Sequence, residues 1–123
     1  MATVLTNTGK NLITNLLAGV AQTAIQFVGW GTGTTAAAPT QTNLITPSAE
    51  ARVSGTRSQI TTTTTNDTYQ VVATLASTSS QAITEAALFD AVTAGNMMIR
   101  GDFGALNLAA SDSIQFTFRV QFT

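Results

Sequence analysis

The carboxyl-terminal part of the chain has the clearest alternation of apolar and polar residues. From position 114 to position 122, every second residue carries a large apolar side chain, and the residues between them are polar. A repeat of two is that of a β-strand with one buried face. We therefore predict a half-buried antiparallel strand at the centre of the core. Arg119 is expected to point outward, and the expected inward residues are Ile114, Phe116, Phe118, Val120 and Phe122.

Residues 6–20 instead repeat with the period of an α-helix. Thr6 or Asn7 can cap its first turn, and Gly19 stands where helices often end in a left-handed residue. The spacing predicts one amphipathic helix, with its apolar stripe buried against a sheet or a partner. The residues of that stripe are Leu12, Ile13, Leu16, Leu17 and Val20.

Two β-hairpins are predicted in the middle of the chain. Residues 51–65 and the alternating residues 69–75 flank Asn66 and Asp67, which favour a turn. The threonine run at 61–65 fits an ordinary strand with a solvated Thr face. Residues 83–90 and 96–103 are expected to pair around a turn at 94–96.

One strand and one long loop are expected before these hairpins. Residues 24–33 are β-prone and end in glycines, whereas residues 34–47 lack periodicity and contain both prolines. One helix followed by about six strands predicts a mainly β protein, with an antiparallel β-sandwich or jelly-roll-like fold. We expect a single domain over residues 1–123, in which residues 1–23 form an amino-terminal arm and the helix.

The composition favours a subunit of an assembly. Only 9% of the residues are charged, against about 25% in an average soluble domain, and uncharged polar residues replace them. Such side chains are easier to bury at a contact than Lys or Glu. A Thr-rich secreted or surface β domain is the alternative explanation.

Charge and residue types exclude several function classes. A net charge of -1 provides no electrostatic footprint for nucleic acid, and no stretch approaches the roughly 18 apolar residues of a membrane span. The chain has no His and no Cys, which excludes the catalytic sites and zinc sites built on them. The carboxylates are scattered singly along the sequence. We therefore predict a protein that is not an enzyme, with no catalytic, cofactor-binding or metal-binding residues.

Glu85 and Trp30 stand apart from the residues around them. Glu85 lies within an apolar strand, where an unpaired charge is costly, so we predict a structural ion pair with Arg100 on the adjoining strand. Arg52 and Arg57 are the next candidates. Trp30 lies between two glycines and is expected either in the core or at an interface.

The order of features resembles small virion proteins of tailed bacteriophages, found among head decoration and tail or fibre proteins. The resemblance covers nearly the whole chain. It consists of an amino-terminal amphipathic helix, a strongly alternating terminal strand and short motifs between them. These motifs are Val28-Gly29-Trp30-Gly31-Thr32-Gly33-Thr34-Thr35, Pro39-x-x-Thr42-x-Leu44, Ile83-x-Glu85-Ala86-x-Leu88-Phe89-x-Ala91 and Met98-x-Arg100.

The resemblance implies a β-rich, non-catalytic and oligomeric protein of the virion, assembled in the cytoplasm of the host bacterium. The leading hypothesis is a capsid cement or decoration subunit that stabilises the head by bridging major capsid proteins. The alternative is a tail-tip, tail-tube-associated or fibre protein that contacts a receptor. A carbohydrate-binding module ranks third, because Trp30 and Tyr69 are the only Trp and Tyr that could form its aromatic platform.

We also expect a homo-oligomer, with a trimer as its natural form at threefold positions of a capsid. Residues 1–5 and 34–47 have little periodicity, yet their apolar side chains must be covered. Neighbouring chains, either copies or other virion proteins, can cover them. The predicted interface residues are Met1, Leu5, Trp30, Leu44 and Ile45.

Overall fold

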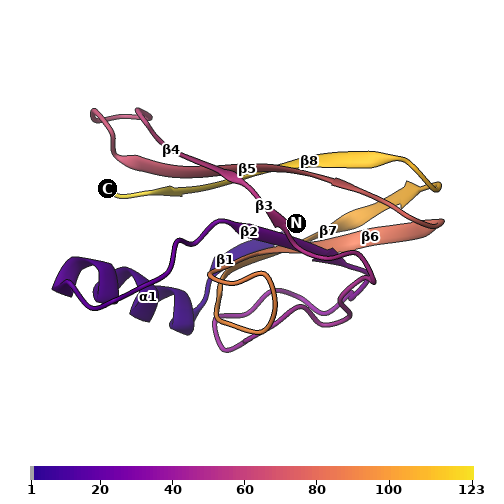
Figure 1. The fold of residues 1–123 in the computed structure, drawn as a ribbon, viewed down its shortest axis with the longest axis horizontal. Coiled ribbons are helices and arrows are strands. Elements are labelled where there is room, and N and C mark those ends of the chain that lie inside the picture. The colour runs from indigo at the N-terminus through magenta and orange to yellow at the C-terminus, as the bar shows by residue number, and fades with distance from the viewer. Residues whose placement is uncertain (1) are drawn as a thin grey trace.

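The chain folds into two antiparallel β-sheets that pack face to face, with one helix near the amino terminus (Figure 1). This computed structural model describes residues 2–123. The larger sheet has the strand order β1-β7-β6-β2-β3, and the smaller one has the order β4-β5-β8. The predicted mainly β fold with one amino-terminal helix is confirmed, as a β-sandwich. In chain order, the elements are β1 (Ala2–Leu5), α1 (Asn7–Ala18), β2 (Phe27–Gly31), β3 (Val53–Ser54), β4 (Thr56–Ile60), β5 (Thr68–Ala76), β6 (Gln81–Phe89), β7 (Met97–Leu108) and β8 (Ser113–Gln121).

Both predicted hairpins form, as β4–β5 and β6–β7. Asn66 in the first turn and Ala94 and Gly95 in the second have positive φ angles, which such turns require. The helix also ends as predicted. The Thr6 hydroxyl accepts a bond from the N–H of Gly9, and Gly19 adopts the left-handed conformation at the other end.

The threonine run at 61–65 is a loop, so its interpretation as a strand was wrong. The carboxylate of Asp67 accepts hydrogen bonds from the backbone N–H groups of Thr62, Thr63 and Thr64. Bonds from the backbone of Thr64 and Thr62 hold the pKa of Asp67 well below its usual range. This local capping competes with strand pairing and curls the run into the hairpin loop.

Residues 2–5 are not a free arm. They form β1, an edge strand that pairs with β7 from Ala2 opposite Asp102 to Leu5 opposite Ile99. The next residue, Thr6, donates its hydroxyl proton to the carbonyl oxygen of Met97 at 2.6 Å. The amino-terminal segment is therefore part of the larger sheet.

The strand β8 is an edge strand, which corrects the prediction that it is central. Its alternation is as predicted, and Arg119 is exposed. However, Phe118 is the only one of the five predicted inward residues that is buried, at 8% exposure, while Ile114, Phe116 and Val120 are half-buried. Phe122 lies beyond the strand and is 55% exposed. The smaller sheet has three strands, so its central strand is β5 and β8 is covered less completely.

The central strands of the larger sheet, β2 and β6, are buried on both faces. One face packs on the smaller sheet around Trp30, whose ring meets that of Phe116 edge to face at 6.2 Å. Residues 34–47 cover the other face, where Leu44 packs with Ala87, Phe89 and Met97. The strand β6 lies in the middle of this sheet and is therefore the element with the most buried surroundings.

The buried position of Phe118 can be tested by replacement with alanine. We expect Phe118→Ala to lower the free energy of unfolding by about 3–5 kcal/mol, because it removes a buried ring and leaves a cavity. Phe122→Ala, at the exposed end of the same residue pattern, is the matched control and is expected to change it by about 0.5 kcal/mol or less. Urea denaturation followed by circular dichroism measures both. Equal effects of the two variants would contradict this assignment of core and surface.

Candidate functional site

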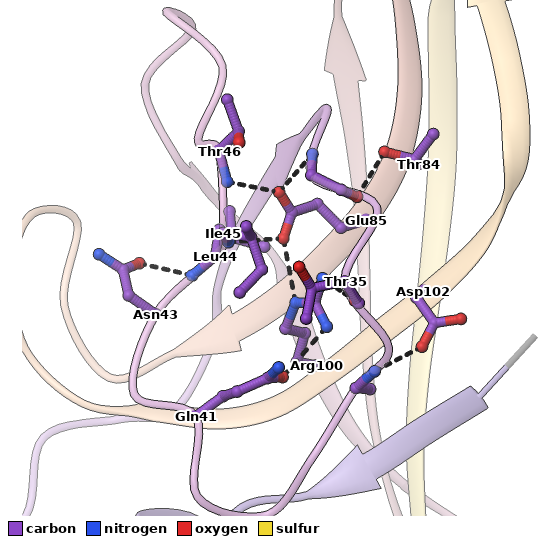
Figure 2. Close-up of polar contacts among 12 residues, drawn as sticks. Thr35, Gln41, Asn43, Leu44, Ile45, Thr46, Thr84, Glu85, Arg100 and Asp102 are labelled. Carbon is purple, nitrogen blue, oxygen red and sulfur yellow. Dashed lines mark hydrogen bonds and ion pairs between the residues drawn. The ribbon is translucent and has the colours of Figure 1, made fainter.

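Glu85 and Arg100 form the ion pair that the sequence predicts. Arg100 Nε lies 3.0 Å from Glu85 Oε1, and both side chains are 0% exposed. They come from the paired strands β6 and β7 and point to the face that residues 34–47 cover (Figure 2). The neighbouring irregularity in pairing between Ile83 and Glu85 helps to turn both Thr84 and Glu85 toward this loop.

The carboxylate of Glu85 holds three backbone N–H groups besides the guanidinium. Its Oε1 atom accepts a bond from Ile45 N at 2.8 Å, and its Oε2 atom accepts bonds from Gly33 N and Thr46 N, each at 2.8 Å. A carboxylate has about four lone-pair sites, and four donors occupy them. Glu85 therefore joins the end of β2 to the end of the loop.

Arg100 holds the middle of the same loop. Its Nη1 atom donates to Gln41 Oε1 at 3.1 Å, and its Nη2 atom donates to the carbonyl oxygen of Thr35 at 2.9 Å. Two neighbouring residues of these strands add further bonds. The Thr84 hydroxyl on β6 donates to Gly33 O, and Asp102 Oδ2 on β7 accepts a bond from the N–H of Ala37. These contacts fix the loop along its whole length, as Figure 2 shows.

Two glycines allow the backbone to approach Glu85 closely. A Cβ atom at Gly33 would overlap Glu85 Oε2 and Ile45, and one at Gly31 would overlap Thr46 and the same carboxylate oxygen. Neither glycine has a positive φ, so close approach, and not backbone strain, explains them. In the sequence these glycines only end a β-prone segment, and nothing in the local pattern connects them with Glu85.

The hydrogen bonds decide the charge of Glu85. Burial raises the pKa of its carboxyl group, but bonds from the backbone of Thr46 and Ile45 and from Arg100 together lower it below its ordinary value. The charged form is therefore the stable one in the folded protein. Because all four acceptor positions are engaged and the group is fully buried, we assign the pair a structural role.

Two of the predicted interface residues are buried within the chain. Trp30 is 2% exposed and donates to Glu50 Oε1, so it lies in the core, and Leu44 is 7% exposed, so its assignment to an interface is wrong. The smaller sheet covers Trp30, and the larger sheet covers Leu44. Leu5 is half-buried against the core, and its place at an interface stays a prediction. Ile45 is exposed and stays a candidate, and Met1 lies outside the described residues.

Within residues 2–123, four of the seven large exposed apolar residues gather at one end of the molecule. Leu16 and Leu17 project from the second half of α1, Val20 follows the end of the helix, and Leu17 is 83% exposed. Figure 1 shows α1 and the carboxyl-terminal end of β8 at the same end of the sandwich. Phe122 is exposed there as well. We call Leu16, Leu17, Val20 and Phe122 the apolar tip.

A groove of about 550 Å³ runs between α1 and the smaller sheet at this tip. Its apolar lining includes Ile13, Ile25 and Met98, and Arg57 is the only charged residue among those that line it. A concave, mainly apolar surface next to exposed leucines is typical of a site for an apolar segment of another molecule. This groove is the candidate functional site.

The sequence predicted the helix but not the exposure of its stripe. Leu12 is buried, because the first half of α1 packs on β7, whereas Leu16 and Leu17 lie beyond that contact. The prediction that a sheet of the same chain buries the whole stripe was therefore wrong. The alternative, that a partner covers the second half of the stripe, stays a prediction.

Within residues 2–123, no three acidic side chains come together as metal ligands, and no helix has the length and hydrophobicity needed to cross a membrane. Trp30 is buried and Tyr69 is half-buried, with its hydroxyl bonded to Ile25 O, so neither ring forms an exposed platform for a sugar. No family model, curated protein or solved structure matches the chain.

Removing the charge of Glu85 should destabilise the fold. In Glu85→Gln, the amide NH₂ would face two of the four donors, and Arg100 would lose its counter-charge, so we expect a loss of about 3–5 kcal/mol. Asp112→Asn, the same change in an exposed turn, is the control and is expected to cost about 1 kcal/mol or less. Denaturant unfolding at neutral pH measures both. A loss in Glu85→Gln no larger than that of the control would contradict the structural role.

The same pair predicts how stability depends on pH. The pKa of Glu85 is lower in the folded state than in the unfolded chain, so its contribution is present above its ordinary value near 4.5 and is lost as pH falls through the lower, folded value. We expect the free energy of unfolding to fall less steeply below pH 4.5 in Glu85→Gln than in the wild type. Parallel curves for the two proteins would contradict this assignment.

Gly33 can be tested separately from the charges. Gly33→Ala places a methyl group against Glu85 and Ile45, so we expect it to displace the loop and lower the melting temperature. Gly104→Ala is the control, because a Cβ atom there meets nothing within 4 Å. Thermal unfolding measures both variants, and equal melting temperatures would show that the loop accommodates the added group.

Proposed function

We propose that this chain is a non-enzymatic structural subunit of a tailed-bacteriophage particle. One observation carries the proposal, namely the exposed apolar tip beside its groove. Exposed leucines and a phenylalanine around an apolar concavity favour a protein that works by packing against other chains. The saturated Glu85–Arg100 pair supports the non-enzymatic part, because the most buried charges of the chain serve its own loop.

The phage origin rests on the sequence motifs, and the structure gives several of them a physical role. The glycines of the aromatic-Gly-x-Gly element approach Glu85, which belongs to another motif, and Arg100 belongs to a third. These separate pieces therefore meet in one network beneath the loop. The network gives these motifs a common structural role in this chain, while the phage origin is proposed from their resemblance alone.

Within the particle, we propose a decoration subunit that bridges major capsid proteins. A small β-sandwich with low charge and an apolar tip suits a site between larger proteins, where the tip is covered. A position in the tail is the competing outcome. Mass-spectrometric stoichiometry of purified particles separates the two, since a decoration subunit is present in many copies and a tail protein in few.

The role of the tip is tested by Leu17→Lys. The side chain is 83% exposed, so we expect the free energy of unfolding to stay within about 0.5 kcal/mol of the wild type. A charge at a contact that must lose water should nevertheless prevent incorporation into particles. Quantitative immunoblotting of purified particles measures incorporation.

Val92→Lys is the matched control. Val92 is also aliphatic and is 50% exposed, but it lies in the β6–β7 turn. We expect normal incorporation of this variant. Normal incorporation of Leu17→Lys as well would remove the tip from the contact, and absence of the wild-type chain from particles would overturn the proposed function itself.

A further inference from the structure

One edge of the smaller sheet is open along the whole of β8. This strand pairs with β5 in unbroken register over nine residues, from Ser113 opposite Ala76 to Gln121 opposite Thr68, and no strand lies on its other side. Edge strands are commonly protected by Pro, a bulge, several charges or shortness. Among Ser113–Gln121, there is no Pro and no bulge, and Arg119 is the only charged residue.

The hydrogen bonds at the two ends of β8 show which backbone groups face outward. Phe122 N donates to Asp67 O, and Ser77 N donates to Asp112 O, so the even-numbered residues bond to β5. Because bonding alternates in an antiparallel pair, the odd-numbered residues direct their N–H and C=O groups to the open edge. The residue in the middle of that row is Thr117.

The sequence of β8 is symmetric about Thr117. From Ser113 to Gln121 it is S-I-Q-F-T-F-R-V-Q, so residues equally distant from Thr117 are chemically matched. Phe116 corresponds to Phe118, and Ile114 corresponds to Val120. Gln115 corresponds to Arg119, which can donate to the amide oxygen.

We propose that β8 pairs antiparallel with β8 of a second copy around a twofold axis at Thr117. In that register all nine residues are paired, and the two smaller sheets become one sheet of six strands. Each Arg119 meets the second copy's Gln115, so no like charges lie opposite one another. The apolar positions meet on the inner face and the polar positions on the outer face.

A second groove gives this pairing an apolar component. It has a volume of about 540 Å³ and lies between β8 and β7, where half-buried Phe103 and Phe116 and exposed Leu106 are found. A strand added to the open edge would cover it. The inference deepens the proposed packing against other chains by naming a second copy as one of them, in a twofold pair and not the trimer expected from the sequence. It rests on that proposal for its biological role, although the contact itself can be measured on the purified chain.

The experiment uses the fact that the residue on a twofold axis meets itself. Thr117→Lys and Thr117→Glu each place like charges opposite one another, so each should weaken self-association about fivefold or more at low ionic strength. An equimolar mixture should restore it, because a Lys then meets a Glu. Thr117→Pro should abolish the dimer, since it removes the outward N–H without breaking a bond to β5. Sedimentation velocity measures association, and circular dichroism checks the fold.

Thr74→Lys and Thr74→Glu are the matched controls, on the exposed position of β5 that pairs with Gln115. We expect their association to equal that of the wild type. A monomeric wild-type chain, a trimer insensitive to the Thr117 variants, or no recovery in the mixture would overturn the inference.

These outcomes are distinguishable from failure of the proposed function. A chain that dimerises as described but is absent from particles would overturn the particle role and leave the β8 contact intact. A chain that enters particles but does not respond to the Thr117 variants would do the opposite.

Discussion

Glu85 and Arg100 place opposite charges on the face of the larger sheet that residues 34–47 cover, and the covering of that face depends on them. A buried ion pair alone is a weak source of stability, because removal of two charges from water offsets their attraction. Here the backbone of Gly33, Ile45 and Thr46 supplies the missing hydrogen bonds. The pair therefore selects one loop conformation, and the buried position of Leu44 follows from it.

The second constraint is the unequal size of the sheets. Three strands cannot fully cover five, so apolar side chains stay half-buried along β8 and beside β7. The helix α1 is also only partly covered, because its first half packs on β7 and its second half extends past that contact. The centre of the chain is thus fully buried and its margins are only partly covered, and the contacts proposed with other chains lie at those margins.

Local patterns were sufficient to predict most elements. The alternation in β8, the cap at Thr6 and the turn at Gly95 each act over a few neighbouring residues, and all three are present. The ion pair was predictable as well, because a charge in an apolar strand needs a partner. The strand predicted for the threonine run was wrong because the Asp67 carboxylate binds the backbone N–H groups of that run. Strand propensity does not describe such a contact.

Burial was harder to predict than secondary structure. An apolar stripe has the same sequence pattern whether its own sheet or another molecule covers it, so the exposure of Leu17 was missed. Likewise, alternation does not tell an edge strand from a central one. The sequence around Trp30 left both the core and an interface open, and its burial against Phe116 of the smaller sheet places it in the core.

The loop of residues 34–47 combines a fixed backbone with free side chains. Glu85, Arg100 and Asp102 hold mainly its main-chain atoms, while the side chains of Thr34, Ala36, Thr40 and Thr42 face solvent. Substitutions at such positions change the surface without changing the path of the chain. Sequence divergence among related proteins should therefore concentrate there, so that new recognition surfaces can evolve on an unchanged scaffold.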